Sequence, residues 1–211
     1  MVTGVNMSTD LSTGYIKTLA KGSGSSTNTL SMFVNTASGV RLNGVANVIT
    51  ADVMASNGVV HVVDAVIGLP TIVTHATANP NFSTLVGALT AEGQPDFVGI
   101  LSGTASSPFT VFAPSNAAFE TFESQNPGTI ASLTSAQLTA VLSYHVVAGA
   151  NVLSTGIPTG PITTFETGTF TISGTTITDE ASRQTNIVAV DVQATNGVIH
   201  VIDNVILPNL N

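Results

Sequence analysis

Two stretches of the chain carry a histidine and an aspartate at the same spacing within an otherwise apolar run. Residues 57–67 have the sequence NGVVHVVDAVI, and residues 196–206 have the sequence NGVIHVIDNVI. In both stretches the histidine precedes the aspartate by three positions: His61 with Asp64, and His200 with Asp203. Such pairs can serve as the acid and base of a catalytic site, or as hydrogen-bonded anchors inside a protein core.

The expected strand geometry favours anchors over catalysis. Successive side chains of a strand point to opposite faces, so His200 and Asp203 fall on different faces, each among apolar neighbours. A strand that is apolar on both faces is typical of the centre of a sheet. A buried polar group there must find a hydrogen-bond partner or cost about 1–3 kcal/mol. We therefore interpret four residues as buried structural staples: His61, Asp64, His200 and Asp203.

Other arrangements of reactive residues are not found in the sequence. None of the serines lies in a Gly-x-Ser-x-Gly motif, and the four histidines show neither H-x-H nor H-x₃-H spacing. The chain has no cysteine, which excludes disulfides and thiolate metal sites. We predict that the protein is not an enzyme and that it uses no metal and no cofactor.

Charged residues are scarce, and acidic residues outnumber basic ones. Only 8% of the residues are charged, and 4 Lys and Arg face 12 Asp and Glu, for a net charge of −8. Nucleic acids and anionic membranes both require a basic protein surface, so we expect neither as a partner. No apolar stretch is long enough to span a bilayer.

The polar residues of the chain are mostly uncharged. They include 51 Ser and Thr and 16 Asn, a composition that we interpret as that of a secreted or cell-surface protein. The opening sequence MVTGVNM has neither the basic nor the apolar region of a signal peptide. We therefore expect the export signal or anchor to lie upstream of these residues.

An internal repeat organises the chain. Residues 47–67 and 186–206 are identical at 12 of 21 positions, at an offset of 139 residues. This offset is the length of a domain rather than the period of a solenoid. Only the second copy has enough preceding sequence for a first half. We predict that residues 1–70 are the C-terminal half of one domain and that residues 71–211 form a complete domain.

The second unit has helical patterns first and strand patterns later. Apolar residues at helical spacing predict a helix over residues 82–89, and Ser115 and Thr134 are plausible N-caps of two further helices. A short strand is expected at residues 109–112, and strands dominate from Tyr144 onward. This segregation predicts an α+β fold.

Three motifs carry a family resemblance. They are FTVFAPSNAAF at residues 109–119, LSYHVV at residues 142–147 and NGVIHVIDNVILP at residues 196–208. Their order and separation resemble those of the fasciclin domain. The resemblance covers residues 71–211 and extends to the repeated strand of the first unit. It implies a compact β-wedge or sandwich with several short helices packed against it, found typically in tandem on extracellular proteins.

The resemblance also draws attention to Tyr144 and His145. The Tyr-His motif of the family is linked to adhesion, which makes both residues candidates for recognition of a partner. As neighbours in an expected strand they would point to opposite sides, so they would not form one catalytic pair. Their apolar neighbours Leu142, Val146 and Val147 favour the alternative, in which both side chains pack in the core.

Two functions are compatible with these observations. The first is an adhesion or ligand-binding module at a cell surface or in a matrix, whose partner is a protein or a glycan. The second is a structural spacer that binds nothing itself. An apolar patch near Tyr144 would favour the first function. We also expect self-association through residues 1–70, because strand 57–67 is apolar on both faces and the first unit has no helices to cover it.

We predict that residues 71–211 fold alone and that residues 1–70 do not. The second unit has helices to cover its sheet, whereas the first has apolar strands without a covering layer. A thermal melt of each segment, expressed separately, tests this. A cooperative transition is expected for residues 71–211, and its absence would refute the prediction.

Overall fold

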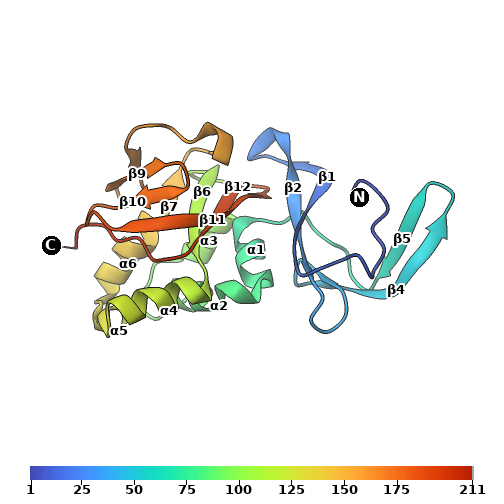
Figure 1. Ribbon diagram of the computed structural model, residues 1–211, viewed down its shortest axis with the longest axis horizontal. Coiled ribbons are helices and arrows are strands. Elements are labelled where there is room, and N and C mark those ends of the chain that lie inside the picture. The colour runs from blue at the N-terminus through green and yellow to red at the C-terminus, as the bar shows by residue number, and fades with distance from the viewer. Residues whose placement is uncertain (211) are drawn as a thin grey trace.

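The computed structural model describes residues 1–210, which form two β-sheets (Figure 1). We call residues 1–70 the first unit and residues 71–210 the second unit. The first sheet is antiparallel and has the order β1-β2-β3-β4-β5. Its strands are β1 (Gly14–Gly22), β2 (Ser25–Asn35), β3 (Arg41–Leu42), β4 (Ala46–Ala55) and β5 (Gly58–Val63).

The second sheet has seven strands in the order β7-β6-β12-β11-β10-β9-β8. All neighbouring pairs are antiparallel except β6 and β12, which run parallel. The strands are β6 (Phe109–Pro114), β7 (Val146–Ala148), β8 (Ile162–Thr163), β9 (Thr169–Ser173), β10 (Thr176–Thr178), β11 (Gln184–Ala194) and β12 (Gly197–Ile202).

The helices belong to the second unit and gather on one side of its sheet (Figure 1). They are α1 (Ile72–Ala78), α2 (Ser83–Leu89), α3 (Phe97–Ser102), α4 (Asn116–Gln125), α5 (Thr129–Ser132) and α6 (Ser135–Tyr144), with 3₁₀ turns at Pro80–Phe82 and Ser154–Gly156. This arrangement confirms the predicted α+β class, with short helices packed against β-structure.

Local sequence signals position two of these helices as predicted. Ser115 caps α4 by accepting a hydrogen bond from the Ala118 amide at 3.2 Å. Thr134 and Gln137 form the capping box at the start of α6. Both helices therefore begin where the sequence predicts.

The internal repeat is visible in the order of the strands. The run β8 to β12 follows the same neighbour order as the run β1 to β5. In the second sheet, β6 and β7 continue beyond β12, whereas β5 is the last strand of its sheet. The division of the chain into half a domain and a complete domain stays a prediction.

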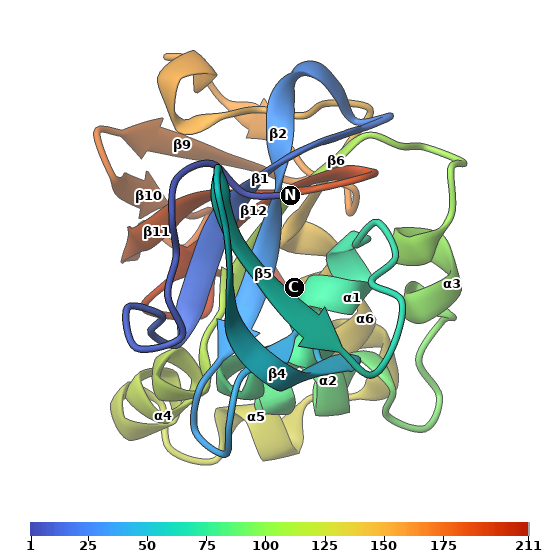
Figure 2. The ribbon, with the colours of Figure 1, turned by 90° about the vertical axis from the view of Figure 1, so that its right-hand side faces the viewer.

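The hairpin of β1 and β2 lies against the second unit (Figures 1 and 2). Lys17 Nζ donates to the Asp191 carbonyl at 2.6 Å, and the Gln193 amide donates to Ser31 Oγ at 3.0 Å. Tyr15 packs edge-on to His75 at 5.4 Å between ring centroids. Burial raises the pKa of Tyr15 to about 12. The hairpin is thus packed against the second unit on one face.

The turn of this hairpin brings the backbones of the two units into direct contact. The Gly24 amide donates to the Thr195 carbonyl at 2.5 Å. A Cβ atom at Gly22 would lie 2.5 Å from the Thr195 Cα, and one at Gly24 would lie 2.8 Å from the Gly197 nitrogen. The Gly-Ser-Gly sequence is typical of a flexible loop, but here the glycines permit backbone contact.

We predict that Gly22→Ala loosens the docked hairpin. The added methyl group overlaps backbone rather than a movable side chain, so the expected loss of unfolding free energy is about 1–3 kcal/mol. Urea denaturation measures the loss, and hydrogen exchange of the β2 amides locates it. Gly68→Ala is the matched control, because nothing lies within 4 Å of the position of its Cβ. Equal stability of the two variants would contradict the prediction.

Candidate functional site

Each of the two aspartates that follow the repeated strands ties that strand to its neighbour. Asp203 accepts hydrogen bonds from the Asn186 amide at 2.7 Å and from its side-chain nitrogen at 3.0 Å. Asp64 accepts the same pair from Asn47, both at 2.7 Å. These bonds hold the carboxylates, and they lower the pKa of Asp64. The predicted burial is wrong, because Asp203 is only partly buried and Asp64 is exposed.

Each of the two strand histidines forms a hydrogen bond with a backbone carbonyl. For His200 the carbonyl belongs to the segment before β8, and for His61 it belongs to the segment before β1. His200 Nε2 lies 2.9 Å from the Val152 carbonyl oxygen, and His61 Nε2 lies 2.8 Å from that of Asn6. His200 is fully buried, and burial lowers its pKa, so its ring is neutral at pH 7. His61 is partly exposed.

A second repeated aspartate, Asp52 in the first unit and Asp191 in the second, binds a serine whose position the sequence did not indicate. Asp191 accepts hydrogen bonds from the Ser154 amide at 2.8 Å and from its hydroxyl at 2.6 Å. Asp52 accepts the same pair from Ser8, at 2.8 and 2.5 Å. Both aspartates have positive φ, near 60°. The serines are 146 residues apart rather than 139, so the repeat offset does not reveal them.

Tyr144 and His145 lie at the end of a helix rather than in a strand. Tyr144 is the last residue of α6 and His145 is its C-cap, which corrects the strand expected to begin there. Both side chains are buried, with exposed fractions of 0% and 4%. In this structure neither side chain is available at the surface, and the recognition role stays a prediction.

The polar atoms of both side chains have partners in the core. The Tyr144 hydroxyl donates to the Thr169 carbonyl at 2.6 Å and accepts from the Glu180 amide at 3.3 Å. His145 Nδ1 lies 2.7 Å from the Val141 carbonyl, and its Nε2 accepts from the Ile206 amide at 3.3 Å. Burial lowers the pKa of His145 to about 4. The pair therefore joins α6 to β9 and to the residues that follow β12.

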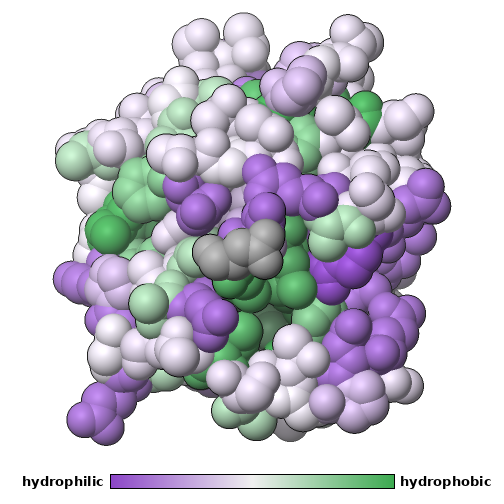
Figure 3. Space-filling model, turned by 90° about the vertical axis from the view of Figure 1, so that its left-hand side faces the viewer, coloured by the Kyte–Doolittle hydropathy of each residue, from purple (hydrophilic) through white to green (hydrophobic). Residues whose placement is uncertain are grey.

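An apolar hollow lies directly above His145. It has a volume of about 270 Å³ and lies between α4, α5, α6 and the segment after β12. Its lining includes Phe119, Phe122, Ile130, Leu133, Val205 and Leu207. Figure 3 shows apolar side chains in a hollow on the side of the second unit that faces away from the first unit. This is the apolar patch near the Tyr-His motif that would favour a binding function.

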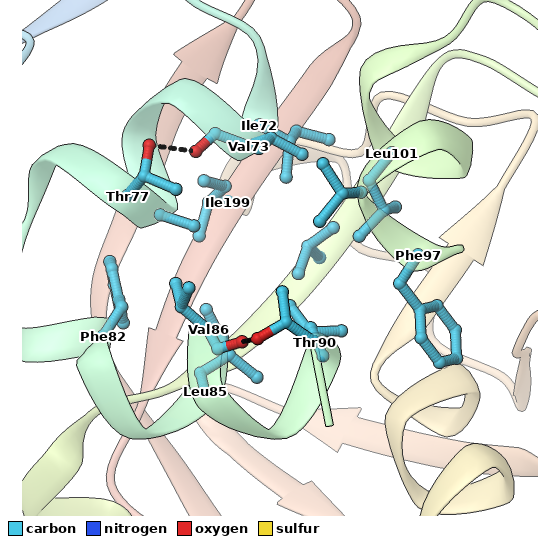
Figure 4. Close-up of a pocket in the computed structure, with 15 residues that line it drawn as sticks. Ile72, Val73, Thr77, Phe82, Leu85, Val86, Thr90, Phe97, Leu101 and Ile199 are labelled. Atoms are coloured by element: carbon cyan, nitrogen blue, oxygen red, sulfur yellow. Dashed lines mark hydrogen bonds between the residues drawn. The ribbon is translucent and has the colours of Figure 1, made fainter. Parts of the chain in front are cut away.

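A second cleft, between α1, α2 and α3, is small. Ile72, Phe82, Leu85 and Leu101 point toward one another across it, above Ile199 of β12 (Figure 4). Its volume is about 40 Å³, which is little more than one water molecule occupies. The cleft is part of the packed core rather than a ligand site.

Within residues 1–210, no three His, Asp or Glu side chains are grouped so that they could hold a metal ion. No helix in this part of the chain is long and apolar enough to cross a membrane.

We predict that Tyr144→Phe destabilises the protein without unfolding it. The variant keeps the buried ring and removes only the hydroxyl that bridges Thr169 and Glu180, so a loss of about 1 kcal/mol is expected. Chemical denaturation measures this loss. Tyr15→Phe, which removes a hydroxyl with a single bond to Asn79, is the matched control with a smaller expected loss. An unchanged midpoint for Tyr144→Phe would show that its hydroxyl is not structural.

Comparison with known proteins agrees with this architecture. The model of the fasciclin domain matches residues 1–70 and 80–208. The protein sll1735 of Synechocystis sp. is 39% identical over 149 residues, which cover 66% of this chain and 98% of that protein. The cell surface glycolipoprotein MPB83 of Mycobacterium bovis is 33% identical over 139 residues, which cover 65% of this chain and 60% of that protein.

The structure is also similar to a FAS1 domain pair from the insect cell adhesion molecule fasciclin I. The TM-score is 0.59 with 25% sequence identity, and the match covers 89% of this chain and 65% of the domain pair. The matched motifs, the mixed sheets with short helices and these relatives agree. The chain belongs to the fasciclin domain family.

Proposed function

We propose that this protein is an adhesion or ligand-binding module that works outside the cell or at its surface. Its family membership carries the proposal, because one relative is a cell surface glycolipoprotein and another is a cell adhesion molecule. The low charge and the abundance of Ser, Thr and Asn support an extracellular site of action. The partner would be a surface or matrix protein or a glycan.

The hollow above His145 is the surface of the second unit that we propose for this binding. Its partly buried rim residues Ile130, Leu133 and Leu207 offer apolar contact area without charge. The buried bonds of Tyr144 and His145 fix the end of α6 on which the hollow rests. In this proposal the Tyr-His motif supports the recognition surface from below and does not contact the partner.

We also propose that the protein is not an enzyme. The buried histidines bind backbone carbonyls, and burial lowers the pKa of His75 and His145 to about 4. Neutral imidazole rings with these hydrogen bonds stabilise the fold. With a pKa this low they are poorly suited to act as general acids or bases near neutral pH.

A structural spacer is the second candidate, and the docked hairpin favours it. Contacts through Tyr15, Lys17 and Gly24 hold the first unit against the second, as a stiff stalk requires. A spacer would bind no ligand through the hollow.

A binding screen of the whole chain against glycans and matrix proteins distinguishes the two candidate functions. The binding module predicts at least one saturable ligand, whose affinity falls by about tenfold or more in Leu133→Gln, because an apolar contact is lost. Val188→Gln changes an exposed residue on β11 and is the control with unchanged affinity. Absence of any ligand would favour the spacer, whereas equal binding of a ligand by the two variants would show that the hollow is not the binding surface.

A further inference from the structure

A buried histidine lies where the first unit meets the second. His75 of α1 is 0% exposed, and the ring of Tyr15 from β1 packs edge-on against it at 5.4 Å between ring centroids. The Asn79 side chain holds Tyr15 in this position by donating to its hydroxyl at 3.2 Å. Figure 1 shows α1 beside the hairpin of β1 and β2. Part of the cover of His75 therefore comes from the docked hairpin.

Only one of the two ring nitrogens of His75 has a hydrogen-bond partner. Its Nε2 lies 3.3 Å from the Gln193 carbonyl oxygen of β11, so the neutral ring donates through Nε2. Its Nδ1 is buried and has no partner within the described residues. Protonation would place a hydrogen on Nδ1, and this new donor would be buried without an acceptor. The docked structure therefore disfavours the protonated ring.

The charged groups of β1 and β11 do not compensate a positive charge on His75. Lys17 of β1 reaches the Asp191 carbonyl of β11 at 2.6 Å, and its positive charge opposes a second one on His75. The Asp191 carboxylate accepts hydrogen bonds from the amide and the hydroxyl of Ser154. The remaining charged residue of β1 is Lys21, which is also basic. His75 forms no ion pair within the described residues.

The other elements at this interface add no acidic group. No titratable residue lies in α2, in α3, in the 3₁₀ turn at Pro80–Phe82 or in β2. The only titratable residue of β12 is His200, whose ring stacks on Phe112. Burial, together with the charge of Lys17, lowers the pKa of His75 to about 4.

We propose that the contact between the β1–β2 hairpin and the second unit is an acid-sensitive switch, in which protonation of His75 releases the hairpin. Separation of the hairpin removes the Tyr15 ring from His75, so that water can solvate the charged imidazole. Acid therefore favours separated units over docked ones. The pair of units is stiff near neutral pH and flexible in acid. This inference does not depend on the ligand proposed for the hollow above His145.

The pKa values of the two states define the pH range of the switch. An imidazole in water has a pKa near 6.5, whereas His75 has a pKa of about 4 in the docked state. Between these values the separated state binds more protons, so docking weakens as the pH falls. The ratio of separated to docked molecules should rise about tenfold for each pH unit below about 6.5 and level off near pH 4. Tyr15 is already protonated throughout this range.

Amide hydrogen exchange of the whole chain between pH 7 and pH 4 tests the proposal. The Gly24 amide donates to the Thr195 carbonyl and the Gln193 amide donates to Ser31 Oγ, so both report separation of the units. After correction for the intrinsic exchange rate at each pH, their protection should fall about tenfold per pH unit below about 6.5. Constant protection would overturn the proposal. An equal fall for the β12 amides would also overturn it, because it would indicate unfolding of the second unit.

His75→Gln and His200→Gln form a matched pair of variants. Both histidines are 0% exposed, and both have a buried Nδ1 without a partner within the described residues. Glutamine keeps a donor for the carbonyl that each Nε2 faces and removes the titration. The protection of the Gly24 amide should lose its pH dependence in His75→Gln and keep it in His200→Gln. The same pH dependence in both variants would refute the role of His75.

An NMR titration of the His75 ring provides a second measurement. In the unaltered chain its pKa should lie near 4. In Tyr15→Ala the ring loses the part of its cover that the hairpin supplies, so its pKa should move toward 6.5. An unchanged pKa in this variant would show that the hairpin does not control the protonation of His75, which would overturn the proposal.

Discussion

The central strand β12 is apolar on both faces, and the other elements of the second unit bury these faces and pair with its edges. Its edges pair with β6 and β11. Ile199 packs with α1, α2 and α3 on one face, while Ile202 packs with β9, β10 and Tyr144 on the other. An apolar strand of this kind exposes aggregation-prone surface unless its faces and edges are covered. The Nε2 atom of the buried histidine of β12 binds the Val152 carbonyl, whereas its buried Nδ1 has no hydrogen-bond partner within the described residues.

In the first unit, β5 has nearly the same sequence as β12, but different elements surround it. The local bonds of the repeat are retained, including those of Asp64 with Asn47, His61 with Asn6 and Asp52 with Ser8. The helices and the parallel strand have no counterpart on β5 within residues 1–210. Local hydrogen bonds are therefore enough to maintain the shape of the sheet, while burial of β5 requires further contacts. The first unit obtains part of its stability from the docked hairpin.

The sequence predicted the features that depend on neighbouring residues and missed those that depend on distant ones. The caps at Ser115 and Thr134, the α+β class and the family follow from local patterns and motifs. The β-rich sequence after Tyr144 and His145 predicts a strand at these residues, but α6 extends to them, and its last turn is buried. The contact at Gly22 and the serine partner of Asp191 join segments far apart, so no local spacing indicates them.

Amide hydrogen exchange of the intact protein, measured for β5 and β12 in one experiment, tests the central claim most directly. The two strands have nearly the same sequence, so the intrinsic exchange rates of their amides are similar. A difference in measured exchange between the strands therefore reflects a difference in hydrogen bonding and burial. We expect the β12 amides to be protected along the strand, and those β5 amides that do not pair with β4 to exchange almost as fast as in an unfolded chain. Equal protection of the two strands would contradict the account, because it would show that β5 is covered on both edges.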